Sequence, residues 1–175
     1  MKKITILFYF ACIIGISIYC TPIDDIIDGS IRFNKWEEAK KDLEAYLKKN
    51  NSDVYAYSLY SVVLKELKLY DEAILALKNS IVHEKSDAKK GEIYFNIGNL
   101  FYDKNQKDIA LEMYQKSIEF DTMLASPYYM SGLIYFELNN TELTIKNWKR
   151  YIGLTTDIEK RKKIEEIIKK IEKDV

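Results

Sequence analysis

A small residue followed by apolar residues on one helical face recurs along the chain at nearly constant intervals. It stands at Ala39, Ala73, Ala110 and Thr144, so the intervals are 34, 37 and 34 residues. A period of roughly 20 to 50 residues is typical of an array of short units that stack on one another. The 175 residues include only 6 Gly and 2 Pro, which leaves little material for the tight turns of hairpins. The sequence therefore predicts a stacked array of helices.

The third unit of the array reads GEIYFNIGNLFYDKNQKDIALEMYQKSIEFDTML and resembles the tetratricopeptide repeat along its whole length. The matching positions carry the aromatic, aliphatic and small residues of that family: Tyr94, Ile97, Gly98, Phe101, Ala110 and Tyr114. Thr122 replaces the closing proline. The resemblance implies two antiparallel helices, in which Gly98 and Ala110 let the backbones approach and the aromatic rings fill the space beside them.

The resemblance divides the chain into four repeats and a capping helix. Their predicted bounds are 20–53, 54–87, 91–124, 125–158 and 159–175. The first repeat is weaker in its opening helix, because Ile27 stands at the glycine position. Ser86 is a good N-cap among the extra residues before the third repeat, so we expect that helix to begin almost one turn early. The predicted fold class is all-α, an α-solenoid of about four helix-turn-helix repeats plus a C-terminal capping helix, nine helices in all.

The predicted capping helix is amphipathic. Ile158, Ile164, Ile168 and Ile171 fall on roughly one face, with Lys and Glu elsewhere. A solenoid needs such a helix, because its terminal repeat would otherwise expose apolar surface. A helix that lies on a membrane surface is the alternative interpretation of the same pattern.

The first twenty residues resemble a bacterial export signal. Lys2 and Lys3 precede an uncharged stretch from Ile4 to Ile18, which predicts a signal peptide over residues 1–19. The segment that ends at Cys20 resembles the lipobox of lipoproteins, although Tyr19 departs from the small residue usual before the cysteine. Because Cys12 lies within the removed segment, Cys20 would remain without a disulfide partner and is the predicted lipidation site. We therefore expect a membrane-anchored lipoprotein of the bacterial cell envelope, facing the periplasm or the surface; an uncleaved N-terminal membrane anchor is the alternative.

The charged residues of the chain argue against several classes of chemistry. The 27 basic and 27 acidic residues balance, whereas a nucleic-acid-binding protein usually has a basic excess. His83 is the single histidine and has no partner in sequence for nucleophilic catalysis. Asp24 and Asp28 belong to a DDxxD pattern that holds magnesium diphosphate in isoprenoid synthases, but acids in the first turn of a helix also stabilise it through the helix dipole. We expect no enzyme activity, no metal, no cofactor, no nucleic acid and no small-molecule substrate.

The expected function is protein binding. In tetratricopeptide arrays the first helix of each repeat lines a concave groove that receives an extended peptide or a helix. The corresponding positions here are largely aromatic and nearly uncharged: Tyr55, Ser58, Val62, Lys65, Phe95, Asn99, Tyr102, Tyr129, Leu133 and Phe136. The basic clamp that some members use for a C-terminal carboxylate is absent, so an apolar peptide or helix is the expected ligand. The resemblance implies an interaction adaptor or scaffold of the cell envelope; a self-associating envelope protein whose groove is a homo-oligomer interface is the alternative.

Overall fold

The computed structural model describes residues 22–173, which contain helices and turns and no strand. The chain separates into two compact units, one ending at Asn51 and one beginning at Ser52. The predicted signal peptide and Cys20 lie outside the described residues. No helix within residues 22–173 is long and apolar enough to cross a lipid bilayer.

The N-terminal unit is a helix pair whose first member is divided. α2 (Pro22–Ile26) continues as a π-helical segment, η1 (Ile27–Ile31), and α3 (Trp36–Lys49) follows. The π-helical segment begins at the position where the tetratricopeptide pattern has its glycine. The two members are joined by buried apolar residues from both, and Ser30 Oγ donates a hydrogen bond to Asp42 Oδ2 at 3.2 Å.

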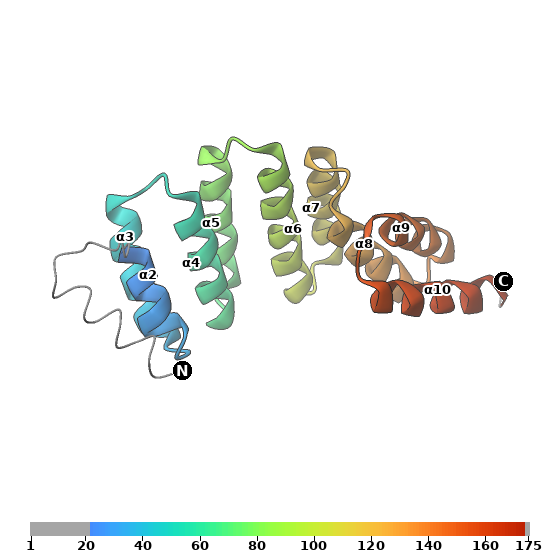
Figure 1. Cartoon of the computed structure of the whole chain (residues 1–175), viewed down its shortest axis with the longest axis horizontal. Helices are drawn as coiled ribbons and strands as arrows, with labels where there is room; N and C mark the ends of the chain where they lie inside the picture. Colours follow the sequence, from blue (N-terminus) through green and yellow to red (C-terminus); the bar gives the residue numbers. More distant parts are fainter. Residues whose placement is uncertain (1–21, 174–175) are drawn as a thin grey trace. The chain divides into compact units, whose positions relative to one another are not determined.

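The unit that begins at Ser52 contains three regular helix pairs and a final helix (Figure 1). The pairs are α4 (Val54–Glu66) with α5 (Tyr70–His83), α6 (Asp87–Asp103) with α7 (Lys107–Phe120), and α8 (Ala125–Glu137) with α9 (Thr141–Leu154). Each pair packs on the next through α5 against α6 and α7 against α8, and α10 (Ile158–Lys173) packs on α9. The prediction of an all-α helical repeat fold is confirmed.

Local capping agrees with the expected phase of the repeats. α6 begins at Asp87, and Ser86 Oγ accepts a hydrogen bond from the Lys89 backbone N–H at 3.4 Å. The predicted early start of this helix is therefore confirmed.

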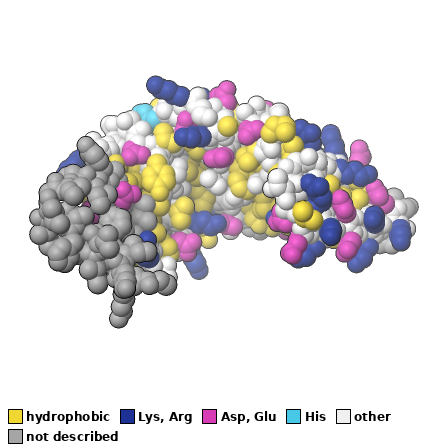
Figure 2. All heavy atoms as spheres, viewed as in Figure 1, with side chains coloured by type: hydrophobic (Ala, Val, Ile, Leu, Met, Phe, Trp, Pro, Cys, Tyr) yellow, Lys and Arg dark blue, Asp and Glu magenta, His cyan; other side chains and the backbone are white. Residues whose placement is uncertain are grey.

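In α10, Ile164 and Ile168 are buried against α9, whereas Ile158 at the first position is 63% exposed, contrary to the expectation that it joins the apolar face. Figure 2 shows side chains of both charge signs over α10, as a terminal helix that faces water requires.

Close backbone approach within the pairs depends on two glycines. A Cβ atom on Gly98 would lie 2.5 Å from the buried ring of Tyr114, and one on Gly132 would overlap the ring of Trp148. Tyr114 and Trp148 are almost fully buried, so neither ring has room to move aside. The expected role of Gly98 is thus observed, and Gly132 has the same role in the next pair.

All four intra-pair turns contain a residue in the left-handed backbone conformation. These residues are Asn34, Lys68, Asn105 and Asn139, with φ between 57° and 60°. Around Asn105, its N–H bonds to Tyr102 O and the next N–H bonds to Phe101 O, both at 2.8 Å. This arrangement satisfies the last carbonyls of the helix and reverses the chain. The turns repeat with the same intervals of 34, 37 and 34 residues as the small residues Ala39, Ala73, Ala110 and Thr144.

Candidate functional site

The ten residues predicted to bind a partner all lie on α4, α6 and α8, the first helices of the three regular pairs. We call the surface that they form the first-helix face. Its most exposed apolar side chains are Tyr55 at 58%, Val62 at 49% and Phe136 at 47%. Six others are half-buried, namely Ser58, Phe95, Asn99, Tyr102, Tyr129 and Leu133. The face therefore presents accessible apolar surface at both of its ends, on α4 and on α8.

The middle of the first-helix face is supported from below by Tyr114 of α7. The rings of Phe95 and Tyr114 are 5.7 Å apart between centroids, and the Tyr114 hydroxyl donates to Asn99 Oδ1 at 2.9 Å. Burial raises the pKa of Tyr114 well above its ordinary value, so the hydroxyl remains a proton donor. The Asn99 oxygen is therefore engaged within the protein.

Polar contacts join successive first helices along one edge of the face. Lys65 Nζ lies 2.9 Å from Asp103 Oδ2, which links α4 to α6. The Tyr102 hydroxyl donates to Glu137 Oε1 at 2.6 Å and Lys107 Nζ lies 3.0 Å from Glu137 Oε2, which links the α6–α7 pair to α8. We call these contacts the polar ladder. It pairs Lys65 with a carboxylate and engages the Tyr102 hydroxyl.

The ladder shifts two titrations. The hydrogen bond to Glu137 raises the pKa of Tyr102 to about 12, with burial contributing in the same direction. The same hydrogen bond and the Lys107 ammonium lower the pKa of Glu137. At neutral pH the pair is therefore a neutral phenol bonded to an ionised carboxylate, which is a strong hydrogen bond.

The α8 part of the face is shared with the helices that follow it. The rings of Tyr129 and Tyr151 are 5.2 Å apart, and Lys160 Nζ of α10 lies 3.7 Å from the centroid of the Tyr129 ring. Phe136 rests on Trp148 at 5.6 Å between centroids. Tyr129 is thus partly covered by the protein itself, whereas Phe136 remains accessible.

The other chemical candidates of the sequence lie on other helices. His83 is exposed at the last position of α5, and Asp24 is exposed in the first turn of α2. Within residues 22–173 no group of three or more His, Cys, Asp or Glu side chains is placed to hold a metal ion.

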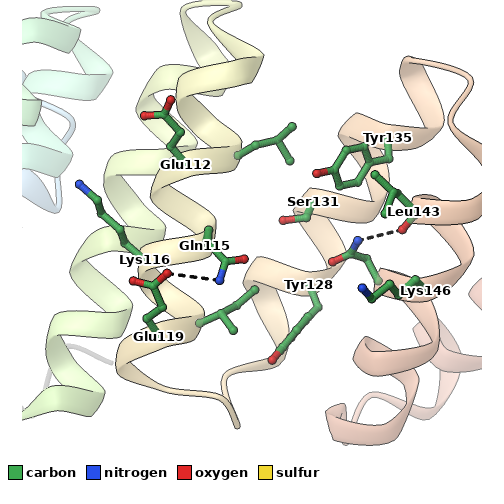
Figure 3. Close-up of a pocket in the computed structure, with 12 residues that line it drawn as sticks. Glu112, Gln115, Lys116, Glu119, Tyr128, Ser131, Tyr135, Leu143 and Lys146 are labelled. Carbon is green, nitrogen blue, oxygen red and sulfur yellow. Dashed lines mark hydrogen bonds between the residues drawn. The ribbon is translucent and has the colours of Figure 1, made fainter.

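Two grooves that sequence reasoning missed lie between second helices. One lies between α5 and α7 over α6 and has a volume of 380 Å³; the other lies between α7 and α9 over α8 and has a volume of 690 Å³ (Figure 3). We call them the α6 groove and the α8 groove. Three residues that line the α6 groove have an equivalent 34 residues later in the lining of the α8 groove. In each case the residue of the α8 groove is the more polar one: Ser131 for Ile97, Tyr135 for Phe101, and Asn147 for Met113. Aligning the third and fourth units would have revealed this signal.

Comparisons with known proteins agree with the helical repeat fold. Residues 91–122 match the family model described as a tetratricopeptide repeat. The fold is similar to that of a tetratricopeptide repeat protein from Parabacteroides merdae ATCC 43184, at 14% identity and a TM-score of 0.69, over 87% of this chain and 61% of the other. It is also similar to MamA from Desulfovibrio magneticus RS-1, at 16% identity and a TM-score of 0.63, over 86% of this chain and 93% of the other.

A curated relative is similar in sequence over part of the chain. It is the ancillary SecYEG translocon subunit of Buchnera aphidicola subsp. Acyrthosiphon pisum (strain APS), 26% identical over 111 residues. The match covers 62% of this chain, and the chain spans only 57% of that relative's length.

Proposed function

From the premise that this chain is a tetratricopeptide repeat protein, we propose that it is a non-enzymatic adaptor that holds an apolar peptide or helix of a partner protein on the first-helix face. The observation that carries the proposal is the accessible apolar surface of Tyr55 and Val62 on α4 and of Phe136 on α8, the two outer first helices of the face. Large aromatic side chains bury much area for little loss of conformational freedom. The one cation predicted for this face, Lys65, is paired with Asp103, which favours an uncharged guest.

Asn99 supplies the directional part of the recognition. Its Nδ2 donors remain available because Tyr114 holds the oxygen, so a guest that presents a backbone carbonyl at this point is favoured. An extended segment offers such carbonyls throughout its length. A helix offers them at its C-terminal end.

The proposed place of action is the bacterial cell envelope, with Cys20 as the lipid anchor. The relative named as ancillary to a translocon supports a role beside a membrane complex. Two or three acyl chains would hold the protein stably on a bilayer, at about 0.8 kcal/mol per buried CH₂. We expect Cys20→Ser to abolish fatty-acid labelling and to release the protein from the membrane fraction. Unchanged labelling would refute the anchor and leave the adaptor proposal standing.

The adaptor proposal is tested by a matched pair of variants. Tyr55→Ser, Val62→Ser and Phe136→Ser are combined in one protein, and Leu75→Ser with Val82→Ser in a control that changes exposed apolar residues of α5, 59% and 77% exposed. A partner is first identified by cross-linking in native membranes, and its affinity for each purified variant is then measured. We expect the first-helix variant to lose most of its affinity for the partner and the control to keep the affinity of the wild type. Equal binding by both would refute the proposal.

Sedimentation of the same two variants tests the alternative function. A self-associating protein would form a stable oligomer that the first-helix variant converts to monomer. A monomeric wild-type protein that binds the cross-linked partner supports the adaptor.

A further inference from the structure

The α8 groove is built on a different stripe of α8 from the first-helix face. Tyr128, Ser131 and Tyr135 form its floor, spaced three and four residues apart, whereas Tyr129 and Phe136 belong to the face. The volume of 690 Å³ falls within the range of about 300 to 1,000 Å³ that is typical of ligand sites. The groove is therefore a separate candidate site.

Two side-chain amides line this groove, and in each the NH₂ group is hydrogen-bonded within the protein. Asn147 Nδ2 donates to Leu143 O at 2.8 Å, and Gln115 Nε2 donates to Glu119 Oε1 at 3.4 Å. Both neighbours are acceptors, so each amide must turn its NH₂ group toward them. The carbonyl oxygens of Asn147 and Gln115 are then left for a ligand, and within the described residues no donor is bonded to either.

Two carboxylates and two lysines line the groove, and they are unequally distributed between its walls. Glu112 and Glu119 stand on α7, and Gln115 lies toward α8 in Figure 3. Lys116 also lines the groove, but its ammonium lies 5.8 Å from the ring centroid of Tyr94, on the side of the α6 groove. Lys146 of α9 is the cation at the opposite wall. The α7 wall is thus rich in acceptors and net negative.

Apolar residues complete the lining. Leu111 and Ile118 of α7 and Leu143 of α9 face the same volume. The Arg150 guanidinium lies over the Tyr128 ring, 5.7 Å from its centroid. The Tyr135 ring is therefore the aromatic surface that a ligand would contact. A ligand that suits this lining has several donors at its tip and an apolar stem.

We propose that the α8 groove binds an arginine-bearing segment of a partner protein. The guanidinium donates to Gln115 Oε1, Asn147 Oδ1 and a carboxylate of α7, because its planar array of five N–H groups matches several acceptors at once. The methylenes of the arginine side chain lie along the aliphatic lining. The Lys146 ammonium donates a hydrogen bond to a backbone carbonyl of the segment. This site shares no residue with the first-helix face, so the two proposals fail separately.

The test uses calorimetric titration of the full chain in detergent with the blocked peptide acetyl-Leu-Arg-Leu-amide. A second peptide carries citrulline, the uncharged isostere of arginine, at the centre. We expect the arginine peptide to bind about tenfold more tightly, as charge-assisted hydrogen bonds require. Equal affinities, or no heat with the arginine peptide up to millimolar concentration, would overturn the proposal.

Two variants locate the binding. Ser131→Ile with Asn147→Met gives the α8 groove apolar residues like those at the equivalent positions of the α6 groove. This variant is expected to abolish arginine-peptide binding. Glu112→Gln with Glu119→Gln changes exposed carboxylates only, which keeps the test valid if the first variant folds poorly, and is expected to weaken binding about tenfold. Glu166→Gln on α10 is the matched control and should bind as the wild type does. If both groove variants bind the peptide unchanged, the site is elsewhere and the proposal is wrong.

Discussion

The α6–α7 and α8–α9 pairs are built on the same plan and differ in what they leave open. Gly98 against Tyr114 and Gly132 against Trp148 bring the helices together in the same way. On the groove side, the apolar Ile97 and the polar Ser131 occupy equivalent positions, and both are buried. Residues that close a pair are thus constrained alike, whereas residues between pairs vary and set the chemistry of each groove.

The largest expected effect separates the two grooves. Ile97→Ser removes apolar atoms from a site that is 1% exposed and adds a hydroxyl there. We expect it to lower the free energy of unfolding by about 3 kcal/mol, as other large-to-small core changes do. Ser131→Ala at the equivalent position should change it by less than about 1 kcal/mol. Urea unfolding followed by circular dichroism measures both, and similar losses would mean that the two grooves are equally dependent on their floors.

The second prediction tests what the pairs have in common. Gly132→Ala and Gly98→Ala each force a methyl group against a buried ring, so we expect each to lower the free energy of unfolding by about 1 to 3 kcal/mol. Gly153→Ala is the control, because a Cβ there would meet no atom within 4 Å and a helical Ala is favoured over Gly. It should leave stability unchanged or slightly raised. A loss for Gly153→Ala as large as for Gly132→Ala would show that ring contact is not the cause.

The repeat period, the helix pairs and the α6 cap could be predicted because they depend on residues close in sequence. Gly98 lies on α6 and Tyr114 on α7, the next helix along the chain. Ser86 caps the helix that directly follows it. The division of the first helix into α2 and η1 was not predicted, because the family pattern shows only that its glycine is missing there.

The location of the ten first-helix residues on three helices agrees with the pattern, but their availability could not be predicted. Lys65 and Tyr102 take partners from neighbouring pairs, and those contacts depend on how one repeat is registered on the next. Lys160 reaches Tyr129 from the final helix, which no repeat pattern describes. Binding at this face stays a prediction.

The third prediction concerns the turn that differs from its equivalents. Lys68 has φ of 60° at a position where Asn34, Asn105 and Asn139 stand in the other turns. Because asparagine tolerates the left-handed conformation better than lysine, we expect Lys68→Asn to raise the free energy of unfolding by about 0.5 to 1 kcal/mol. Lys78→Asn, on the exposed side of α5, is the control and should lower it, since asparagine is a weaker helix former. Identical effects of the two changes would refute this explanation of the turn.

The smallest expected effect is the pH response of the polar ladder, which joins the two compared pairs. The pKa of Tyr102 is raised from 10.0 to about 12, so its contribution to stability is complete below pH 10 and is lost as pH rises through 12. The pKa of Glu137 is lowered, so its contribution is complete above 4.5 and is lost as pH falls through the lower value of the folded state. Ultraviolet titration of tyrosinate, taken as the difference between wild type and Tyr102→Phe, measures the Tyr102 midpoint. Glu137→Gln should move that midpoint toward 10, and Glu142→Gln should not; if neither moves it, burial rather than the hydrogen bond to Glu137 holds the phenol neutral.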